Sequence, residues 1–262
     1  MTEKTHQELQ SKVNEKYKEV CNLVFQRDQE QYRRCRYYET SYQLLVGEYA
    51  YNLKKWQYET FCRRNCYLMI ADALEQGKVV FLPAIKSKGM KELRKERVEL
   101  GNRLACLNCA KEHAERWYDL NDEEEKELNE LYRDIVPFVH PDLVNNLSDY
   151  EQELFYNAIG AFSDGNLDLL RQTVADIYTL PATHEMVDSF SLQKEWNRLL
   201  IIERKVKTEI RSLRSEYSSK IRELVDSPEK LRSTQEELLT GTDLWKQAAE
   251  QYTTDIYHLL GA

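Results

Sequence analysis

The sequence predicts an all-α protein in which long, coiled-coil-like helical hairpins flank a small helical module. The first observation is composition: of 262 residues, 31% are charged, 8 are glycine and 5 are proline, which favours long helices over sheets or disorder. The second is spacing, because apolar residues recur at intervals of three and four in nearly every segment, as on one face of a helix. We expect no sheet, except that residues 79–82 could form either a short two-stranded piece or simply an apolar loop.

Residues 1–118 are expected to form the first long helical hairpin, with its loop at residues 77–90. No proline interrupts residues 4–76, so one long helix should present a seam to partner helices. A second helix follows the loop and should fold back on the first. The seam begins with Val13, Tyr17, Val20 and Val24.

The start of the second helix is strongly basic. Such a cluster could hold a phosphate or an acidic partner, or it could be an ordinary solvated helix surface, and we favour the solvated surface. The cluster consists of Lys86, Lys88, Lys91, Arg94, Lys95 and Arg97.

Residues 119–180 are expected to form the small module, built around the tripeptide His140-Pro141-Asp142. Capping boxes begin one helix after Asn121 and another after Ser148. Pro141 ends the first of these helices, because the residue before a proline is pushed out of the helical region. Two helices packed antiparallel should present His140 and Asp142 at the tip of a polar loop.

Residues 185–262 carry a heptad pattern and are expected to form an antiparallel coiled-coil hairpin. Ser227-Pro228 divides the pattern, since serine is a good N-cap and proline suits the first position of a helix. Each helix has a single apolar stripe. The two helices must therefore pair with each other, with the N-terminal helices or with another chain.

Within residues 121–162 the chain resembles the J-domain family, the co-chaperones of DnaK-type ATPases. Tyr132-Arg133 precedes the His-Pro-Asp tripeptide at the position of the family's helix II, and a helix rich in phenylalanine and alanine follows, as helix III does. The matching residues are Leu128, Tyr132, Arg133, Ile135, His140, Pro141, Asp142, Phe155, Ala158, Ala161 and Phe162.

The module departs from the family in its charge. Helix II of a J-domain has a basic face, but only Arg133 keeps that charge here. Between Asp119 and Leu180 there are 15 acidic and 3 basic residues, giving 3 − 15 = −12. A surface of that sign would repel an acidic partner. Pro137 also lies in the last turn of the first helix, where it removes one backbone hydrogen bond.

The resemblance implies a co-chaperone adaptor that docks a DnaK-type chaperone and holds a client through its helical flanks. By that resemblance Asp142 would accept from a basic group of the chaperone, His140 and Pro141 would shape the loop, and Arg133 would add a positive contact next to Tyr132. The alternative is a non-catalytic helical scaffold that binds other proteins, with a degenerate J-domain that no longer engages DnaK. Catalysis is not expected, since His140 and Asp142 have no nucleophile beside them in the motif.

Four cysteines and a histidine could approach one another if the first hairpin closes. Their spacings of three and four place them on helix faces, and thiolates with an imidazole are zinc ligands. Zinc-binding cysteine pairs usually lie in tight turns, however, so we expect ordinary reduced cysteines, no metal and no cofactor. The residues are Cys62, Cys66, Cys106, Cys109 and His113.

The remaining expectations concern location and partners. No apolar run approaches the length needed to span a bilayer, and the polar N-terminus lacks a signal-peptide core, so we expect a cytoplasmic protein without a membrane partner. The net charge of −8 makes nucleic-acid binding unlikely.

Overall fold

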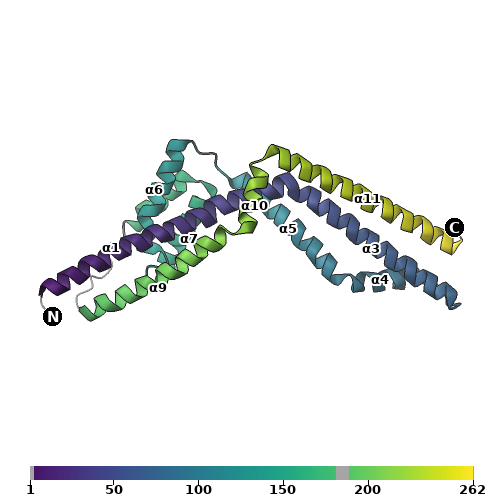
Figure 1. Ribbon diagram of the computed structural model, residues 1–262, viewed down its shortest axis with the longest axis horizontal. Coiled ribbons are helices and arrows are strands. Elements are labelled where there is room, and N and C mark those ends of the chain that lie inside the picture. Colours follow the sequence, from purple (N-terminus) through teal and green to yellow (C-terminus); the bar gives the residue numbers. More distant parts are fainter. Residues whose placement is uncertain (1–2, 181–188, 262) are drawn as a thin grey trace. The chain divides into compact units, whose positions relative to one another are not determined.

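The computed structural model describes residues 3–180 and 189–261, and the regular structure in these ranges is entirely helical (Figure 1). The prediction of an all-α fold is confirmed. Of the two alternatives for residues 79–82, the structure shows the loop and not the strand, since residues 79–81 have no regular structure and a helix begins at Leu82. Pro83 lies in the first turn of that helix, where a missing N–H costs nothing.

The chain divides into two compact units, each made from two separate stretches of sequence. Unit 1 comprises Met1–Tyr38 and His113–Lys220, and unit 2 comprises Glu39–Glu112 and Ile221–Ala262. The predicted segments 1–118, 119–180 and 185–262 followed the chain consecutively. They do not coincide with these units, because the helices pair with partners that are distant in the sequence.

Unit 1 joins the start of the long N-terminal helical stretch to the central helices and the first C-terminal helix. Its elements are α1 (Glu3–Asp28), the π-helical segment η1 (Gln29–Cys35), α6 (Asp122–Val139), α7 (Asp149–Asp164), α8 (Leu167–Ile177) and α9 (Ser189–Leu213).

Helices α1 and α9 lie side by side and run in the same direction (Figure 1). Lys16 of α1 bonds to Glu203 of α9, and further along both helices in the same direction Arg27 bonds to Glu209. The apolar stripe of α9 is therefore buried against the N-terminal helix. This was one of the three pairings that the sequence left open.

The core of unit 1 lies where α1 and α9 meet α6, α7 and α8. Tyr132 of α6 stacks on Phe162 of α7 with ring centroids 4.2 Å apart, and Phe25 of α1 approaches both rings. The apolar faces that the sequence predicted for these helices are buried in this core. Its fully buried residues include Val20, Val24, Leu128, Ala158, Leu170, Leu192, Leu199 and Val206.

Unit 2 is built mainly from three helical stretches that pack along one another. Its elements are the π-helical segment η2 (Gln43–Gly47), α3 (Glu48–Glu75), α4 (Leu82–Glu92), α5 (Arg94–Arg116) and α11 (Pro228–Leu260), while α2 (Arg36–Tyr42), α5 and α10 (Glu216–Val225) cross the boundaries between units.

Helix α11 packs along α3, again in parallel. Phe61 faces Trp245 with ring centroids 5.4 Å apart. About two turns further along both helices, Tyr67 faces Tyr252 with ring centroids 6.1 Å apart. The predicted antiparallel hairpin of the two C-terminal helices is thus corrected: α9 packs on α1 within unit 1, and α11 packs on α3 within unit 2. Ser227 does cap α11, with Pro228 at its first position, as predicted.

The loop predicted at residues 77–90 is shorter than expected. Helix α4 already begins at Leu82, and Gly89 lies inside it, buried against Asn65 and Cys66 of α3. No described helix is long and apolar enough to cross a membrane.

Candidate functional site

The helices on both sides of the His-Pro-Asp tripeptide begin and end as their local sequences predict. The Asn121 side chain accepts from the backbone N–H of Glu124, whose carboxylate bonds back to the Asn121 N–H, and Ser148 with Glu151 repeats the pattern at α7. Gly165 ends α7 with φ = +80°, a conformation that favours glycine.

The His140 ring is enclosed within unit 1. His140 is the C-cap of α6, with extended backbone before Pro141, and only 2% of the residue is exposed. Its Nδ1 accepts the backbone N–H of Asp142 at 3.0 Å. Its Nε2 lies 3.2 Å from a carboxylate oxygen of Asp28 and 2.9 Å from Nη2 of Arg27. His140 thus shapes the loop from inside.

Asp142 uses both carboxylate oxygens within the chain. Oδ2 accepts from Nη1 of Arg27 at 2.6 Å, and Oδ1 accepts from Nζ of Lys205 at 2.7 Å. Its side chain is 18% exposed. Burial alone would raise the pKa of Asp142, but the bonds to Lys205 and Arg27 lower it overall. The sequence placed this carboxylate at an exposed loop tip with little packing, and the structure corrects that expectation.

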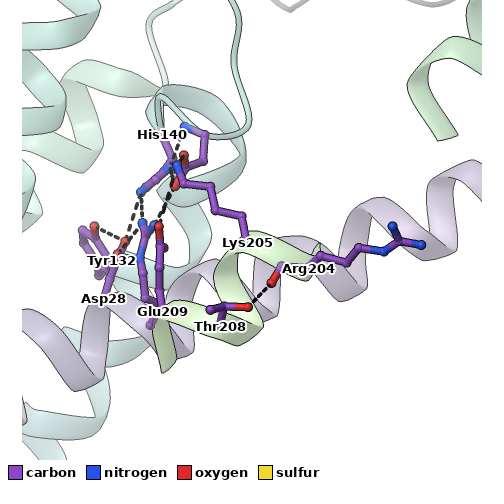
Figure 2. A network of polar contacts seen from close by, with 9 residues as sticks. Asp28, Tyr132, His140, Arg204, Lys205, Thr208 and Glu209 are labelled. Atoms are coloured by element: carbon purple, nitrogen blue, oxygen red, sulfur yellow. Dashed lines mark hydrogen bonds and ion pairs between the residues drawn. The ribbon is translucent and has the colours of Figure 1, made fainter. Parts of the chain in front are cut away.

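Arg27 of α1 is the centre of a polar network that includes Asp28, His140 and Glu209, which are labelled in Figure 2. Besides Asp142, it donates from Nη1 to Glu209 at 2.9 Å and from Nε to its neighbour Asp28 at 2.8 Å. Burial would lower the pKa of Arg27, but the charge of Asp28 and the bonds to Glu209 and Asp142 raise it overall. One buried guanidinium therefore joins α1, the tripeptide and α9.

The Asp28 side chain is fully buried, and the chain surrounds it with donors. Oδ1 accepts from Arg27, and Oδ2 accepts from the Tyr132 hydroxyl at 2.9 Å. Burial, reinforced by the charge of Asp28, raises the pKa of Tyr132 well above its usual value. Tyr132 therefore remains a neutral donor to this carboxylate.

The geometry supports cohesion between helices. Apart from the His140 ring, the network holds two cations, Arg27 and Lys205, and three carboxylates, those of Asp28, Asp142 and Glu209, giving 2 − 3 = −1. Every one of these charges has an opposite charge within hydrogen-bond distance, and a bonded network of this kind fixes relative helix positions. Proton-transfer catalysis would need a substrate beside His140, and the ring is enclosed by protein.

The structure brings only part of the predicted partner-binding set to the surface. Pro141 and Arg133 are exposed, with the Arg133 guanidinium 4.5 Å from the ring centre of Phe25. Tyr132 and His140 are buried and Asp142 is largely engaged. In this conformation a partner can touch Pro141 and Arg133 but cannot reach Tyr132.

Sequence reasoning missed the partners of the tripeptide: Arg27, Asp28, Lys205 and Glu209. A signal existed for one of them. The seam of α1 runs Val13, Tyr17, Val20, Val24 at steps of four and three, and the next step reaches Arg27. A charged residue at a buried seam position needs a partner of opposite charge. The identity of that partner could not be read from spacing.

The cysteines and the histidine considered for zinc take separate roles. Cys62 and Cys66 lie on α3, Cys106 and Cys109 are exposed on α5, and none of the six cysteines, all within the described residues, forms a disulfide. His113 is buried in unit 1 with Nε2 3.3 Å from the Asp164 carboxylate, and burial lowers its pKa. Among residues 3–180 and 189–261, no group of three or more histidine, cysteine or acidic side chains is arranged to hold a metal.

Replacing Asp142 with asparagine is expected to lower the free energy of unfolding by about 1.5–3 kcal/mol at pH 7, since bonds to charged groups contribute about that much. A residue exposed at a loop tip, as the sequence placed Asp142, would instead cost less than about 1 kcal/mol. Because the folded pKa of Asp142 lies below the unfolded value, this stability is present above the unfolded pKa and is lost as pH falls through the folded pKa.

Urea denaturation of the wild type and Asp142→Asn at pH 7, 5 and 3 measures the effect. The difference in free energy of unfolding between the wild type and Asp142→Asn should become smaller between pH 5 and pH 3. Asp134→Asn on the exposed face of α6 is the control and should change stability by no more than about 0.5 kcal/mol at every pH. A difference for Asp142→Asn that is independent of pH would contradict the role of its charge.

Comparison of the chain with protein-family models, with curated proteins and with solved structures finds no match. The site is therefore interpreted from its own geometry.

Proposed function

We propose that the chain is a non-catalytic helical scaffold of the cytoplasm that binds other proteins. In this proposal the His-Pro-Asp loop holds helices of the same chain together through ion pairs. One observation carries this proposal: both carboxylate oxygens of Asp142 are bonded within the chain, to Arg27 and to Lys205. The contact that the J-domain resemblance reserves for a basic group of a chaperone is already made by the protein's own cations.

A chaperone that engaged both carboxylate oxygens of Asp142 would have to displace Arg27 as well as Lys205. The Arg27 side chain is only 9% exposed, and its departure would leave the fully buried Asp28 without its cation. Removing one partner from a buried ion pair costs about 3–5 kcal/mol. This cost would be subtracted from the free energy of docking, which favours the scaffold over the co-chaperone.

The scaffold also needs surfaces for other proteins, and unit 2 offers them. Large apolar side chains are exposed on its helices and on the turn between α3 and α4, and exposed apolar surface is typical of interaction sites. They include Leu68, Leu74, Val79, Phe81, Leu239 and Leu244.

The co-chaperone remains the second candidate because of the exposed side of the loop. Pro141 is exposed, and the side chain of Lys205 is 55% exposed, so its bond to Asp142 is easily exchanged with solvent or with another cation. In this second candidate the protein would release Asp142 from Lys205 before docking.

Steady-state ATP turnover of a DnaK-type chaperone separates the two candidates. The assay contains wild type, Asp142→Asn or Lys205→Ala, with the chaperone's own J-domain protein as positive control. We expect turnover to stay at the basal rate with all three proteins while the positive control stimulates it. The assay should be run at two salt concentrations, since repulsion from the acidic module would weaken with salt.

Stimulation by the wild type that disappears in Asp142→Asn would overturn the scaffold proposal in favour of the co-chaperone. Stimulation by Lys205→Ala alone would show that the chain retains a docking loop and keeps it bonded. Capture of the chaperone on immobilised protein, with and without ATP, checks whether binding occurs without stimulation.

A further inference from the structure

Unit 2 contains a cleft of about 450 Å³ between α3, α4 and α11. This volume lies in the range of small-molecule sites, which are mostly apolar with a few polar groups. The cleft is unrelated to the His-Pro-Asp loop, which belongs to unit 1. Its lining includes Ile70, Ile85, Met90, Ile256, Tyr257 and Leu260.

The lining of the cleft is mainly apolar. Ile70 is fully buried, and aliphatic side chains of α4 and α11 face it across the opening. The two thiols in the lining, Cys62 and Cys66, behave as apolar groups, because burial raises the pKa of both above their usual value and keeps them protonated. A hydrocarbon chain would be stabilised here by burial of its surface.

The charged groups of the lining are Lys86, Arg63 and Glu59, a balance of 2 − 1 = +1. Arg63 is held in place, with Nη1 donating to the Ala249 carbonyl at 3.0 Å and to Thr253 Oγ1 at 2.9 Å.

Lys86 is the group that is available to a ligand. It is exposed on α4 and forms no ion pair with any residue that the structure describes. Its positive charge lowers the pKa of the Cys66 thiol, partly opposing the effect of burial, so the ammonium lies close to the apolar interior. An unpaired cation beside an apolar cleft is complementary to an anion that carries an apolar chain.

We propose that this cleft binds an anionic amphiphile of the alkyl carboxylate class. The alkyl chain occupies the space between α3, α4 and α11, and the carboxylate accepts a charge-assisted hydrogen bond from Lys86. An alkylammonium ion of the same length would meet Lys86 as a like charge. An alcohol of the same length would gain the apolar burial without the ion pair.

Isothermal titration with dodecanoate, kept below the concentration at which it aggregates, tests the proposal on the full chain. We expect saturable binding of one dodecanoate per chain, several-fold weaker binding of dodecanol and the weakest binding for dodecylammonium. Lys86→Gln should weaken dodecanoate by about three- to tenfold and leave dodecanol unchanged. Lys88→Gln is the matched control, since Lys88 lies on the same helix outside the lining, and it should bind dodecanoate as the wild type does.

Thiol alkylation locates the ligand. Mass spectrometry of the alkylated protein reads each cysteine separately, and dodecanoate should slow the reaction of Cys62 and Cys66. Cys106 and Cys109 are exposed on α5 and lie outside this cleft, so their rates should not change. Far-UV circular dichroism verifies that the helices are intact in each sample.

Four results would overturn the proposal. The first is absence of saturable binding, and the second is equal affinity for dodecanoate, dodecanol and dodecylammonium, which would mean apolar adsorption only. The third is binding without protection of Cys62 and Cys66. Protection that increases with protein concentration in the absence of dodecanoate would identify a second copy of the chain as the occupant and would also overturn it.

Discussion

Replacement of Arg27 with alanine is expected to lower the free energy of unfolding of unit 1 by about 3–5 kcal/mol. The guanidinium bonds to three carboxylates, and the Asp28 carboxylate is fully buried. Without Arg27, Asp28 would keep only the hydroxyl of Tyr132 and the ring of His140 beside it. The loss is larger than for an ordinary hydrogen bond, because a buried charge is left without an opposite charge.

Arg204→Ala is the matched control for Arg27→Ala. Arg204 lies on α9 beside the network, but Figure 2 shows its guanidinium pointing away from it, and the residue is exposed. Its removal should change stability by no more than about 0.5 kcal/mol. Peptide-resolved hydrogen exchange is the best measurement, since it reads α6 and α7 separately from unit 2.

A double-mutant cycle between Arg27→Ala and Asp142→Asn tests whether the two side chains act together. We expect a coupling energy of about 1–3 kcal/mol, as for residues in one ion-pair network. Two results would contradict the role of Arg27 as the centre of the network. One is that the effects of the two substitutions are additive, and the other is that Arg27→Ala lowers the free energy of unfolding by less than about 1 kcal/mol.

Phe162→Ala should destabilise unit 1 by a similar amount, about 3–5 kcal/mol, since truncating a buried phenylalanine removes apolar burial and leaves a cavity. Phe162 is fully buried, stacks on Tyr132 with an interplanar angle of 12° and lies 6.4 Å from the ring of Phe25. The stack also positions the Tyr132 hydroxyl that bonds to Asp28. Damage to the apolar core should therefore extend to the ionic network.

Urea denaturation with hydrogen exchange at α6 and α7 measures this effect. Tyr156→Ala on the same helix is the control, because Tyr156 is mostly exposed and its loss should cost less than about 1 kcal/mol. If exchange at α7 were as fast in Tyr156→Ala as in Phe162→Ala, the ring stack would not be the source of stability.

The sequence by itself determined the local features of the fold. The helix starts at Asn121, Ser148 and Ser227 and the helix end at Gly165 follow from capping residues and from the conformational freedom of glycine. These features depend on contacts between residues a few positions apart. They can therefore be read from the order of residues in the chain.

The sequence also identified the tripeptide as the centre of the candidate site, but it did not identify the residues that contact the tripeptide. His140 and Asp142 were expected at an exposed tip, and they are instead bonded to Asp28, Arg27 and Lys205. Arg27 is 115 residues away from Asp142 in the sequence. A periodic pattern gives the face on which a residue lies and says nothing of which distant face it meets.

The pairing of the long helices was decided by tertiary structure alone. The apolar stripes of α9 and α11 are compatible with an antiparallel hairpin, with pairing on the N-terminal helices or with another chain, because each stripe fits any complementary stripe. The choice of α1 for α9 and α3 for α11 depends on particular matches, such as Lys16 with Glu203 and Phe61 with Trp245. Such matches are a property of two surfaces in contact, and that contact exists only in the folded protein.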